Sequence, residues 1–444
     1  MLELLDRTSV IVKDLVLIGG GHSHAIVLKM FGIKPLPGVR LTLISDVLHA
    51  PYSGMLPGHV AGFYNYDECH IDLRSLAEFA GCQILVDRAI AIDFNKNLVI
   101  CQTRPPVNFD LLSVDIGSTP ATLSVPGGAE YAIAAKPVPQ FLASWNQLIS
   151  ERQNHPQKPL RIAIVGGGAG GVELALNMQF RLGKEEGRRK FGNEQCTGCN
   201  GCNGWILRED ARAKEEEEEE LEIHLFHSGA ELMPGHNKRV RRRLKEILMS
   251  RGIKLHLMEK VSAIEKPETI DIEDNQECPM PNAQCPMPNA QISCESGLKL
   301  ECDRIFWVTQ ASPANWLRKS GLATDSNGFM QVNDCLQSVS HPNVFGAGDI
   351  AAMVNYPRPK AGVFAVRQGK PLFENLQQFL LQKPLKPFAP QEQYLGLIGT
   401  GNKRAIASRG SFMWESALLW YWKDWIDRQF MQKFSNLPKT GNTK

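Results

Sequence analysis

The feature that most constrains the fold is a motif that occurs twice: an apolar strand, a glycine-rich turn and a helix. The first copy runs from Leu15–Ile18 into Gly19-Gly20-Gly21, and the second from Arg161–Val165 into residues 166–171. The pyrophosphate of a dinucleotide binds backbone N–H groups at a helix N-terminus, and only glycine lets the backbone approach closely enough. Two copies 147 residues apart therefore predict two nucleotide-binding domains.

Length and composition agree with a two-domain globular protein. The chain has 444 residues, of which 43% are hydrophobic and 22% charged, which excludes a disordered or fibrous protein. A formal charge of +2, with one short basic run at Lys238–Lys245, gives no reason to expect nucleic acid as a partner. The sequence has no apolar run of about 18 residues and no ordered signal peptide, so we expect a cytoplasmic protein.

The first glycine turn departs from the usual fingerprint at one position. Gly19 would make the tight turn and Gly21 the close approach, but His24 stands where the third glycine is usual. A polar residue should follow the second strand to hold the ribose hydroxyls. Asp46 and, just before it, Ser45 stand there, and either fits that role.

The second turn matches the fingerprint at all three positions, with Gly166, Gly168 and Gly171. His227 and Ser228 stand at the end of its second strand, where a carboxylate would favour NADH over NADPH. The missing carboxylate leaves NADPH open, with Lys238 or Arg239 as partners for its 2′-phosphate.

The two turns, together with Phe345-Gly-Ala-Gly-Asp349, resemble the flavoproteins of the pyridine nucleotide-disulfide oxidoreductase superfamily. The segments Asp110–Pro120 and Ile305–Pro313 resemble two further strands of that superfamily, although Gln310 replaces the usual glycine in the second. The resemblance implies FAD in the first domain and NAD(P)H in the second. It also implies that Asp349 contacts the ribityl chain of the flavin.

A narrower resemblance rests on four segments: Ala50–Gly58, Asp115–Ser118, Pro359–Gly369 and Trp422–Arg428. Together they are similar to NADH-dehydrogenase-like flavoproteins that are often fused ahead of selenide, water dikinase. No kinase domain follows here, so the resemblance implies a free-standing member or the flavin half alone, with such a kinase domain as a candidate partner.

These segments also imply further site residues. The additional flavin contacts expected from them are Ser53, Gly117, Gly348 and Phe364. Glu173 is the candidate for positioning the nicotinamide, and the alternative is a carboxylate favoured by the dipole in the first helical turn. Lys360 is the candidate for stabilising reduced flavin at its pyrimidine edge, and the alternative is a surface lysine.

The predicted fold class is α/β, with two Rossmann-like dinucleotide-binding domains, for FAD and NAD(P), and a C-terminal α+β extension. The FAD domain is expected in residues 1–125 and 325–444, and the NAD(P) domain in residues 126–324. The latter carries two expected insertions. Residues 184–220 end in six glutamates, and residues 275–296 contain a tandem repeat of seven residues at Cys278–Gln291.

The absence of a cysteine pair from one segment narrows the range of reactions that the chain could catalyse. Disulfide reductases of this superfamily carry a C-x-x-x-x-C pair at the flavin, and the matching segment Tyr52–Gly58 has none. We therefore expect an FAD-dependent NAD(P)H dehydrogenase that passes electrons to a quinone-like or other small acceptor. The alternatives are a reductase that serves selenium or sulfur metabolism and a non-enzymatic flavin redox sensor.

Two further segments carry hypotheses. Cys196, Cys199 and Cys202 have the spacing of zinc or iron–sulfur ligands, but without a fourth ligand nearby we interpret them as thiols of a loop and predict no metal. Near the C-terminus, apolar residues at helical spacing predict an amphipathic helix: Trp414, Leu418, Trp422, Trp425, Ile426 and Phe430. Residues 411–434 would then contact a membrane peripherally, as in type II NADH dehydrogenases, or pack on the protein itself or on a partner.

Overall fold

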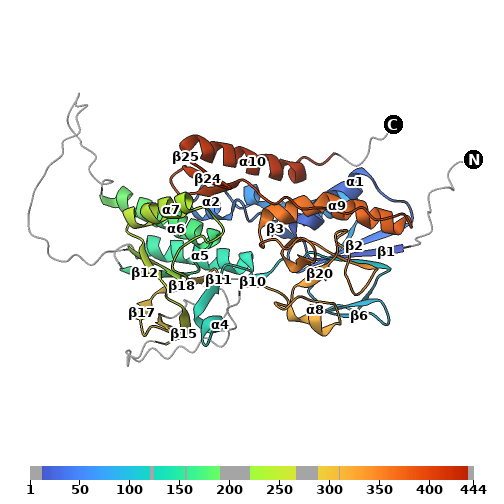
Figure 1. Ribbon diagram of the computed structural model, residues 1–444, viewed down its shortest axis with the longest axis horizontal. Coiled ribbons are helices and arrows are strands. Elements are labelled where there is room, and N and C mark those ends of the chain that lie inside the picture. Colours follow the sequence, from blue (N-terminus) through green and yellow to red (C-terminus); the bar gives the residue numbers. More distant parts are fainter. Residues whose placement is uncertain are drawn as a thin grey trace, which may run out of the picture.

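Two five-stranded parallel sheets form the centre of the molecule (Figure 1). This computed structural model describes residues 13–120, 125–155, 158–190, 221–266, 289–309 and 311–438. The strand order of the first sheet is β21-β9-β1-β2-β5, and that of the second is β11-β18-β12-β13-β14. The predicted α/β class with two Rossmann-like domains is confirmed.

The first sheet gathers strands from both ends of the chain. Its strands are β1 (Lys13–Ile18), β2 (Val39–Ser45), β5 (Gln83–Val86), β9 (Leu111–Val114) and β21 (Val344–Gly346). Helix α1 (His22–Ile33) packs against α3 (Leu73–Ala80) and α9 (Gly362–Leu380). A small antiparallel sheet accompanies it: β6 (Ala89–Asp93), β7 (Leu98–Cys101) and β8 (Val107–Asn108).

The second sheet lies within residues 132–307. Its strands are β11 (Ala132–Ala134), β12 (Leu160–Val165), β13 (Leu221–His227), β14 (Lys254–Leu257) and β18 (Arg304–Trp307). Its helices are α5 (Val138–Asn154), α6 (Ala169–Lys190) and α7 (Lys238–Ser250). A β-meander follows: β15 (Val261–Glu265), β16 (Ala290–Cys294) and β17 (Lys299–Cys302). The central strands β1 and β12 are apolar and buried over most of their length, as expected for parallel strands covered on both faces.

The C-terminal extension is a three-stranded antiparallel sheet followed by a long helix. Its elements are β23 (Gly396–Gly399), β24 (Ala405–Arg409), β25 (Phe412–Ser416) and α10 (Ala417–Ser435). Helix α10, red in Figure 1, lies along one side of the molecule and contacts elements of the first domain as well as its own sheet.

Short elements connect these layers. In the first domain they are β3 (His49–Pro51), α2 (Leu56–Val60), the 3₁₀ turn η1 (Asp67–Cys69), β4 (His70–Asp72), α8 (Asn315–Lys319), β20 (Met330–Val332), the 3₁₀ turn η3 (Gly348–Ile350) and β22 (Ala351–Met353). Between the two domains they are β10 (Thr119–Pro120), α4 (Gly128–Tyr131) and β19 (Ala311–Ser312), with β10 paired to β19.

Regular elements extend into both ranges that the sequence assigned to insertions. Helix α6 continues to Lys190, beyond the expected start of the first insertion at residue 184. Strand β16 begins at Ala290, inside the range expected for the second insertion, because residues 290–294 pair with both neighbours in the meander. The triple-cysteine segment, Gln310 and most of the seven-residue repeat lie outside the described residues.

Candidate functional site

The first glycine loop joins β1 to α1 where the backbone passes very close to β9. Gly19 has a φ of +92°, and its N–H donates to Ile44 O at 2.8 Å. A β-carbon at Gly19 would lie 2.4 Å from Asp115 O, and one at Gly21 would lie 2.3 Å from the Asp115 carboxyl group. Only glycine fits these two positions. Gly21 is also the N-cap of α1 and has no side chain to cap the helix, although the Asp115 carboxyl group accepts from His24 N–H in the first turn at 3.1 Å.

His24 fills the place of the third glycine and faces inward. Its side chain is fully buried, with Nδ1 2.7 Å from Gly19 O and Nε2 2.8 Å from Ser113 Oγ. Burial lowers the pKa of His24 to about 4, so the ring is neutral at pH 7. Both ring nitrogens are satisfied by the protein, so His24 supports the loop from beneath.

The two candidates for the ribose hydroxyls stand at the end of β2. Ser45 Oγ donates to Val47 O at 2.8 Å, which turns this hydroxyl toward its own backbone. Asp46 lies at the surface and forms an ion pair with Arg88 at 2.8 Å. An exposed ion pair of this kind costs little to rearrange, so Asp46 is the more available of the two acceptors.

Asp349 follows β21 and meets residues from two other segments. Its carboxylate accepts from Lys136 Nζ at 2.9 Å and from Ser118 Oγ at 3.2 Å. Burial raises the pKa of Asp349, but the charge of Lys136 and the hydrogen bonds outweigh this effect and lower it, so Asp349 is ionised. Lys136 belongs to the second domain, and the ion pair therefore joins the two domains at the site.

Lys360 and Phe364 lie beside Asp349. Lys360 Nζ donates to Ala351 O at 2.7 Å and sits 4.1 Å from the centre of the Phe329 ring. Burial lowers its pKa, so Lys360 is not an ordinary surface lysine. Phe364 packs edge-on against Tyr394, 5.6 Å between ring centres. A cavity of about 490 Å³ is lined by Asp349, Lys360 and Phe364, among others.

Gly348, another expected flavin contact, also lines this cavity, and the remaining two, Ser53 and Gly117, lie near these groups in the fold. Ser53 Oγ would be 2.9 Å from a β-carbon at Gly362, so Ser53 touches the first residue of α9. Gly117 has a φ of +66°, and a β-carbon there would meet no described atom within 4 Å. It follows β9 and directly precedes Ser118, which binds Asp349. The structure thus brings the ends of β9, β21 and α9 to one place.

The second glycine loop repeats the backbone arrangement of the first. Gly166 N–H donates to Phe226 O at 2.9 Å, and a β-carbon at Gly166 would lie 2.7 Å from Val308 O. A β-carbon at Gly171 would lie 1.8 Å from Gly166 O, so the helix can approach the strand only with glycine there. A β-carbon at Gly168 would meet no described atom within 4 Å, which leaves room for a ligand there.

His227 and Ser228 lie at the end of β13, beside this loop, where neither of them is a carboxylate. His227 packs under Gly167, and Ser228 is exposed. Lys238 and Arg239 are also exposed, in the first turn of α7, which Asn237 caps through Val240 N–H.

Glu173 lies just beyond the first turn of α6 and reaches the C-terminal extension. Its Oε1 accepts from Gly399 N–H at 2.7 Å. Burial raises the pKa of Glu173 to about 7, against the opposing effect of Lys423. The structure therefore gives this carboxylate a tertiary partner and places it beyond the first helical turn, to which the dipole effect is largely confined.

A polar cluster on α10, absent from the residues singled out in the sequence, lies near Glu173. Lys423 Nζ donates to Gly54 O and to Asp427 Oδ2, each at 2.6 Å, and Tyr52 Oη donates to Asp427 Oδ1 at 3.1 Å. The cluster links the helix to the segment that lacks the cysteine pair. Two signals were available in the sequence: the segments Ala50–Gly58 and Trp422–Arg428, which carry the narrower resemblance, and the i, i+4 pair Lys423 and Asp427.

The thiols of the described residues are not activated. Burial raises the pKa of Cys69 to about 12, and it also raises the pKa of Cys335, which is the thiol nearest to a flavin-facing motif in the sequence. No group of three or more metal-ligating side chains occurs within the described ranges. His22 Nε2, beside the first glycine loop, is buried and has no hydrogen-bond partner in the described structure.

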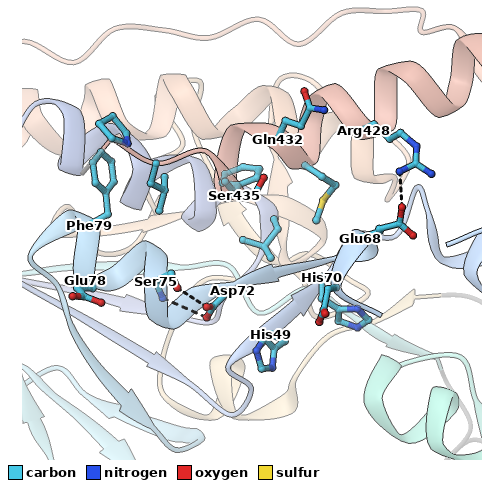
Figure 2. Close-up of a pocket in the computed structure, with 16 residues that line it drawn as sticks. His49, Glu68, His70, Asp72, Ser75, Glu78, Phe79, Arg428, Gln432 and Ser435 are labelled. Atoms are coloured by element: carbon cyan, nitrogen blue, oxygen red, sulfur yellow. Dashed lines mark hydrogen bonds and ion pairs between the residues drawn. The ribbon is translucent and has the colours of Figure 1, made fainter. Parts of the chain in front are cut away.

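A second cavity, of about 640 Å³, lies between α3 and the C-terminal half of α10 (Figure 2). Its polar groups are largely engaged with one another: Asp72 caps α3 through Ser75, and Glu68 pairs with Arg428 at 2.6 Å. His70 lines the cavity with Nε2 buried and without a partner among the described atoms. None of the site residues predicted from the sequence lines this cavity.

The outer face of α10 is apolar over its first half. Leu418 is 69% and Trp425 59% exposed, and Tyr421, Trp422 and Ile426 are exposed as well. The prediction of a single apolar face was wrong in two residues: Phe430 is buried against Tyr52, and Trp414 lies on β25 before the helix begins. None of the helices in the described ranges is long and apolar enough to cross a membrane.

Known proteins and solved structures match most of the chain. The family model described as pyridine nucleotide-disulphide oxidoreductase matches residues 13–369. The chain is 24% identical to ferroptosis suppressor protein 1 of Xenopus tropicalis, over 84% of this chain and 83% of that protein. It is 20% identical to the NADH dehydrogenase-like protein YutJ of Bacillus subtilis, over 93% and 99% of the two chains. The sulfide:quinone oxidoreductase of Aquifex aeolicus has the same fold, with a TM-score of 0.70, 17% identity and 97% and 93% coverage.

The close approach at Gly171 yields a first prediction. Gly171→Ala should lower the free energy of unfolding by about 1–3 kcal/mol, and with it the melting temperature, and should weaken NADH or NADPH binding, because the β-carbon overpacks against Gly166 O. Fluorescence titration with each nucleotide and thermal unfolding measure the two effects. Gly183→Ala on the same helix is the control, since its β-carbon would meet only the flexible end of Gln179. Equal affinities in the two variants would contradict the prediction.

Proposed function

Since this chain belongs to the pyridine nucleotide-disulphide oxidoreductase family, we propose that it is an FAD-dependent NAD(P)H dehydrogenase whose electrons pass to a quinone-like acceptor. The observation that carries the proposal is the pair of glycine loops at equivalent ends of two parallel sheets. The absence of cysteine from Tyr52–Gly58 directs the electrons away from a protein disulfide. FAD, when bound, would accept hydride from the nicotinamide and release electrons one or two at a time.

The residues of the first domain fit FAD. Gly19 and Gly21 would allow the pyrophosphate to reach the backbone at the start of α1, while Ser45 or Asp46 would take the ribose hydroxyls. Asp349 is ionised and would accept from the ribityl hydroxyls. Ser53, Gly117, Gly348, Lys360 and Phe364 surround the same region, and the unpartnered His22 Nε2 is a polar atom that a ligand would satisfy.

The residues of the second domain fit a nicotinamide dinucleotide. Gly166, Gly168 and Gly171 form the complete loop, with open space at Gly168. His227 and Ser228 carry no negative charge toward a 2′-phosphate, so both NADH and NADPH suit the site, and Lys238 and Arg239 stand near its end. The electron acceptor is proposed as a quinone because a protein of the same fold is a sulfide:quinone oxidoreductase. A role in selenium metabolism rests on the sequence resemblance alone.

The direct test is anaerobic mixing of the FAD-loaded protein with NADH and with NADPH. We expect at least one of them to bleach the flavin absorbance within one turnover, and addition of a soluble quinone to restore it. Selenite and polysulfide serve as the alternative acceptors in the same assay. Persistent flavin absorbance with both nicotinamides would contradict the dehydrogenase proposal and favour the redox sensor.

Glu173 is proposed to position the nicotinamide and to stabilise positive charge as hydride leaves it. Burial raises the pKa of Glu173 to about 7, so its negative charge appears as the pH rises through 7. The rate of flavin reduction should therefore rise over that range. Glu173→Gln should lack the rise and be roughly tenfold slower above pH 7. Stopped-flow measurements across pH 5.5–8.5 test this, and Glu173→Asp is expected to restore the rise. If the Gln variant instead keeps the wild-type pH profile, the proposal is contradicted and Glu173 has only a structural role, through its hydrogen bond with Gly399.

The apolar outer face of α10 is proposed to dock on a membrane surface, where a quinone would be available. Trp422 and Trp425 suit the interface between headgroups and acyl chains. Replacing both by serine should lower binding to phospholipid vesicles by roughly 10- to 100-fold, from the apolar area no longer buried. The matched control replaces Gln429 and Gln432, which are exposed on the polar half of the same helix. Sedimentation with vesicles gives the answer, and a wild-type protein that stays in the supernatant would refute docking.

A further inference from the structure

Asp115 is a buried carboxyl group directly beneath the first glycine loop. It follows β9, is 2% exposed, and accepts from His24 N–H at 3.1 Å. Its side chain occupies the space that a β-carbon at Gly21 would need, and Oδ1 would lie 2.3 Å from a β-carbon at Gly348. One carboxyl group thus touches both the glycine loop and the turn that presents Asp349.

The fold itself does not require a carboxyl group at this position. In the second domain Val308 occupies the equivalent place: its N–H donates to Val165 O, as Asp115 N–H donates to Ile18 O, and its carbonyl lies under Gly166 as that of Asp115 lies under Gly19. Val308 supports a complete glycine loop with an apolar side chain. The carboxyl group of Asp115 therefore serves the first site specifically.

The charges around Asp115 oppose its ionisation. Burial raises the pKa of Asp115 to about 7, and the ionised Asp349 on η3 acts in the same direction. From α1, the bonds from His24 and Ser23 lower it in part, and the ring of His24 is neutral. Lys136 and Lys360 are directed at Asp349 and Ala351, and burial lowers the pKa of the nearby His22 to about 4.

We propose that Asp115 is a positioning residue that must carry a proton when FAD is bound, so that flavin binding takes up a proton at this position. The inference rests on the proposed function, because the ligand of the first glycine loop is taken to be FAD. A pyrophosphate bound at the start of α1 adds two negative charges beside a carboxyl group that no solvent reaches. The neutral acid removes this repulsion while it keeps the contacts with Gly21 and Gly348.

The direction of the effect follows from linkage. Below pH 7 Asp115 is already protonated in the free protein, so FAD affinity is independent of pH there. Above pH 7 the free protein must first bind a proton, and the affinity falls by up to about tenfold for each pH unit. The fall ends where the pKa of the FAD-bound form is passed.

The experiment is titration of the FAD-free full-length protein with FAD between pH 6 and 9, followed by quenching of flavin fluorescence. The wild-type protein should lose at least about tenfold in affinity across this range. Asp115→Asn, which is isosteric and always neutral, should bind FAD with an affinity that is nearly constant with pH. Asp110→Asn is the matched control, since Asp110 just precedes the same strand but pairs with Lys13 at the surface and should keep the wild-type dependence.

A second measurement needs no variant. The heat of FAD binding at pH 8, in two buffers of different ionisation enthalpy, should reveal uptake of roughly half a proton or more by the wild-type protein. No uptake, or the same pH dependence in wild type and Asp115→Asn, would overturn the proposal. Failure of the wild-type protein to bind FAD at any pH would instead contradict the proposed function, so the two failures are distinguishable.

Discussion

The close approach of three backbone segments at each glycine loop is the constraint on which the rest of the structure depends. At both loops the first glycine donates to the neighbouring strand and lies against the carbonyl of a third strand. Such an approach leaves no room for side chains on the loop glycines themselves, so the loop backbone can be reached by a ligand at the positive end of the helix dipole. The two sites thus share one backbone geometry. They differ in the side chains beneath the loops: His24 and Asp115 in the first domain stand at the positions that Gly171 and Val308 occupy in the second.

The C-terminal extension forms hydrogen bonds with residues of both domains at the candidate site. Gly399 binds Glu173 of the second domain, while Lys423 and Asp427 on α10 bind Gly54 and Tyr52 of the first. Charged groups in such a place are costly unless they are paired, and here each has a partner on another element. Helix α10 therefore has two chemically different faces: an inner face that orders the residues around the proposed flavin, and an outer face that remains apolar.

Local patterns in the sequence predicted the elements, but not the contacts that complete the site. The glycine turns and their strands were predicted because tight turns and buried strands need particular residues within a few positions. Lys136 and Asp349 are separated by 213 residues and Glu173 and Gly399 by 226, and no local pattern marks such pairs. Helical spacing likewise identified the apolar residues of α10 but not their direction, since the contact with Tyr52 draws Phe430 inward.

The two acidic residues of the first site differ because their surroundings differ. Asp349 has Lys136 and Ser118 within hydrogen-bond distance, so the negative charge is stable and suits hydroxyl donors. Burial raises the pKa of Asp115 to about 7, the negative charge of Asp349 acts in the same direction, and the N–H and O–H donors from the start of α1 offset this only in part. Because Lys136 comes from the second domain, the ion pair that stabilises the charge on Asp349 forms where the two domains meet. The charge on Asp349 in turn raises the pKa of Asp115.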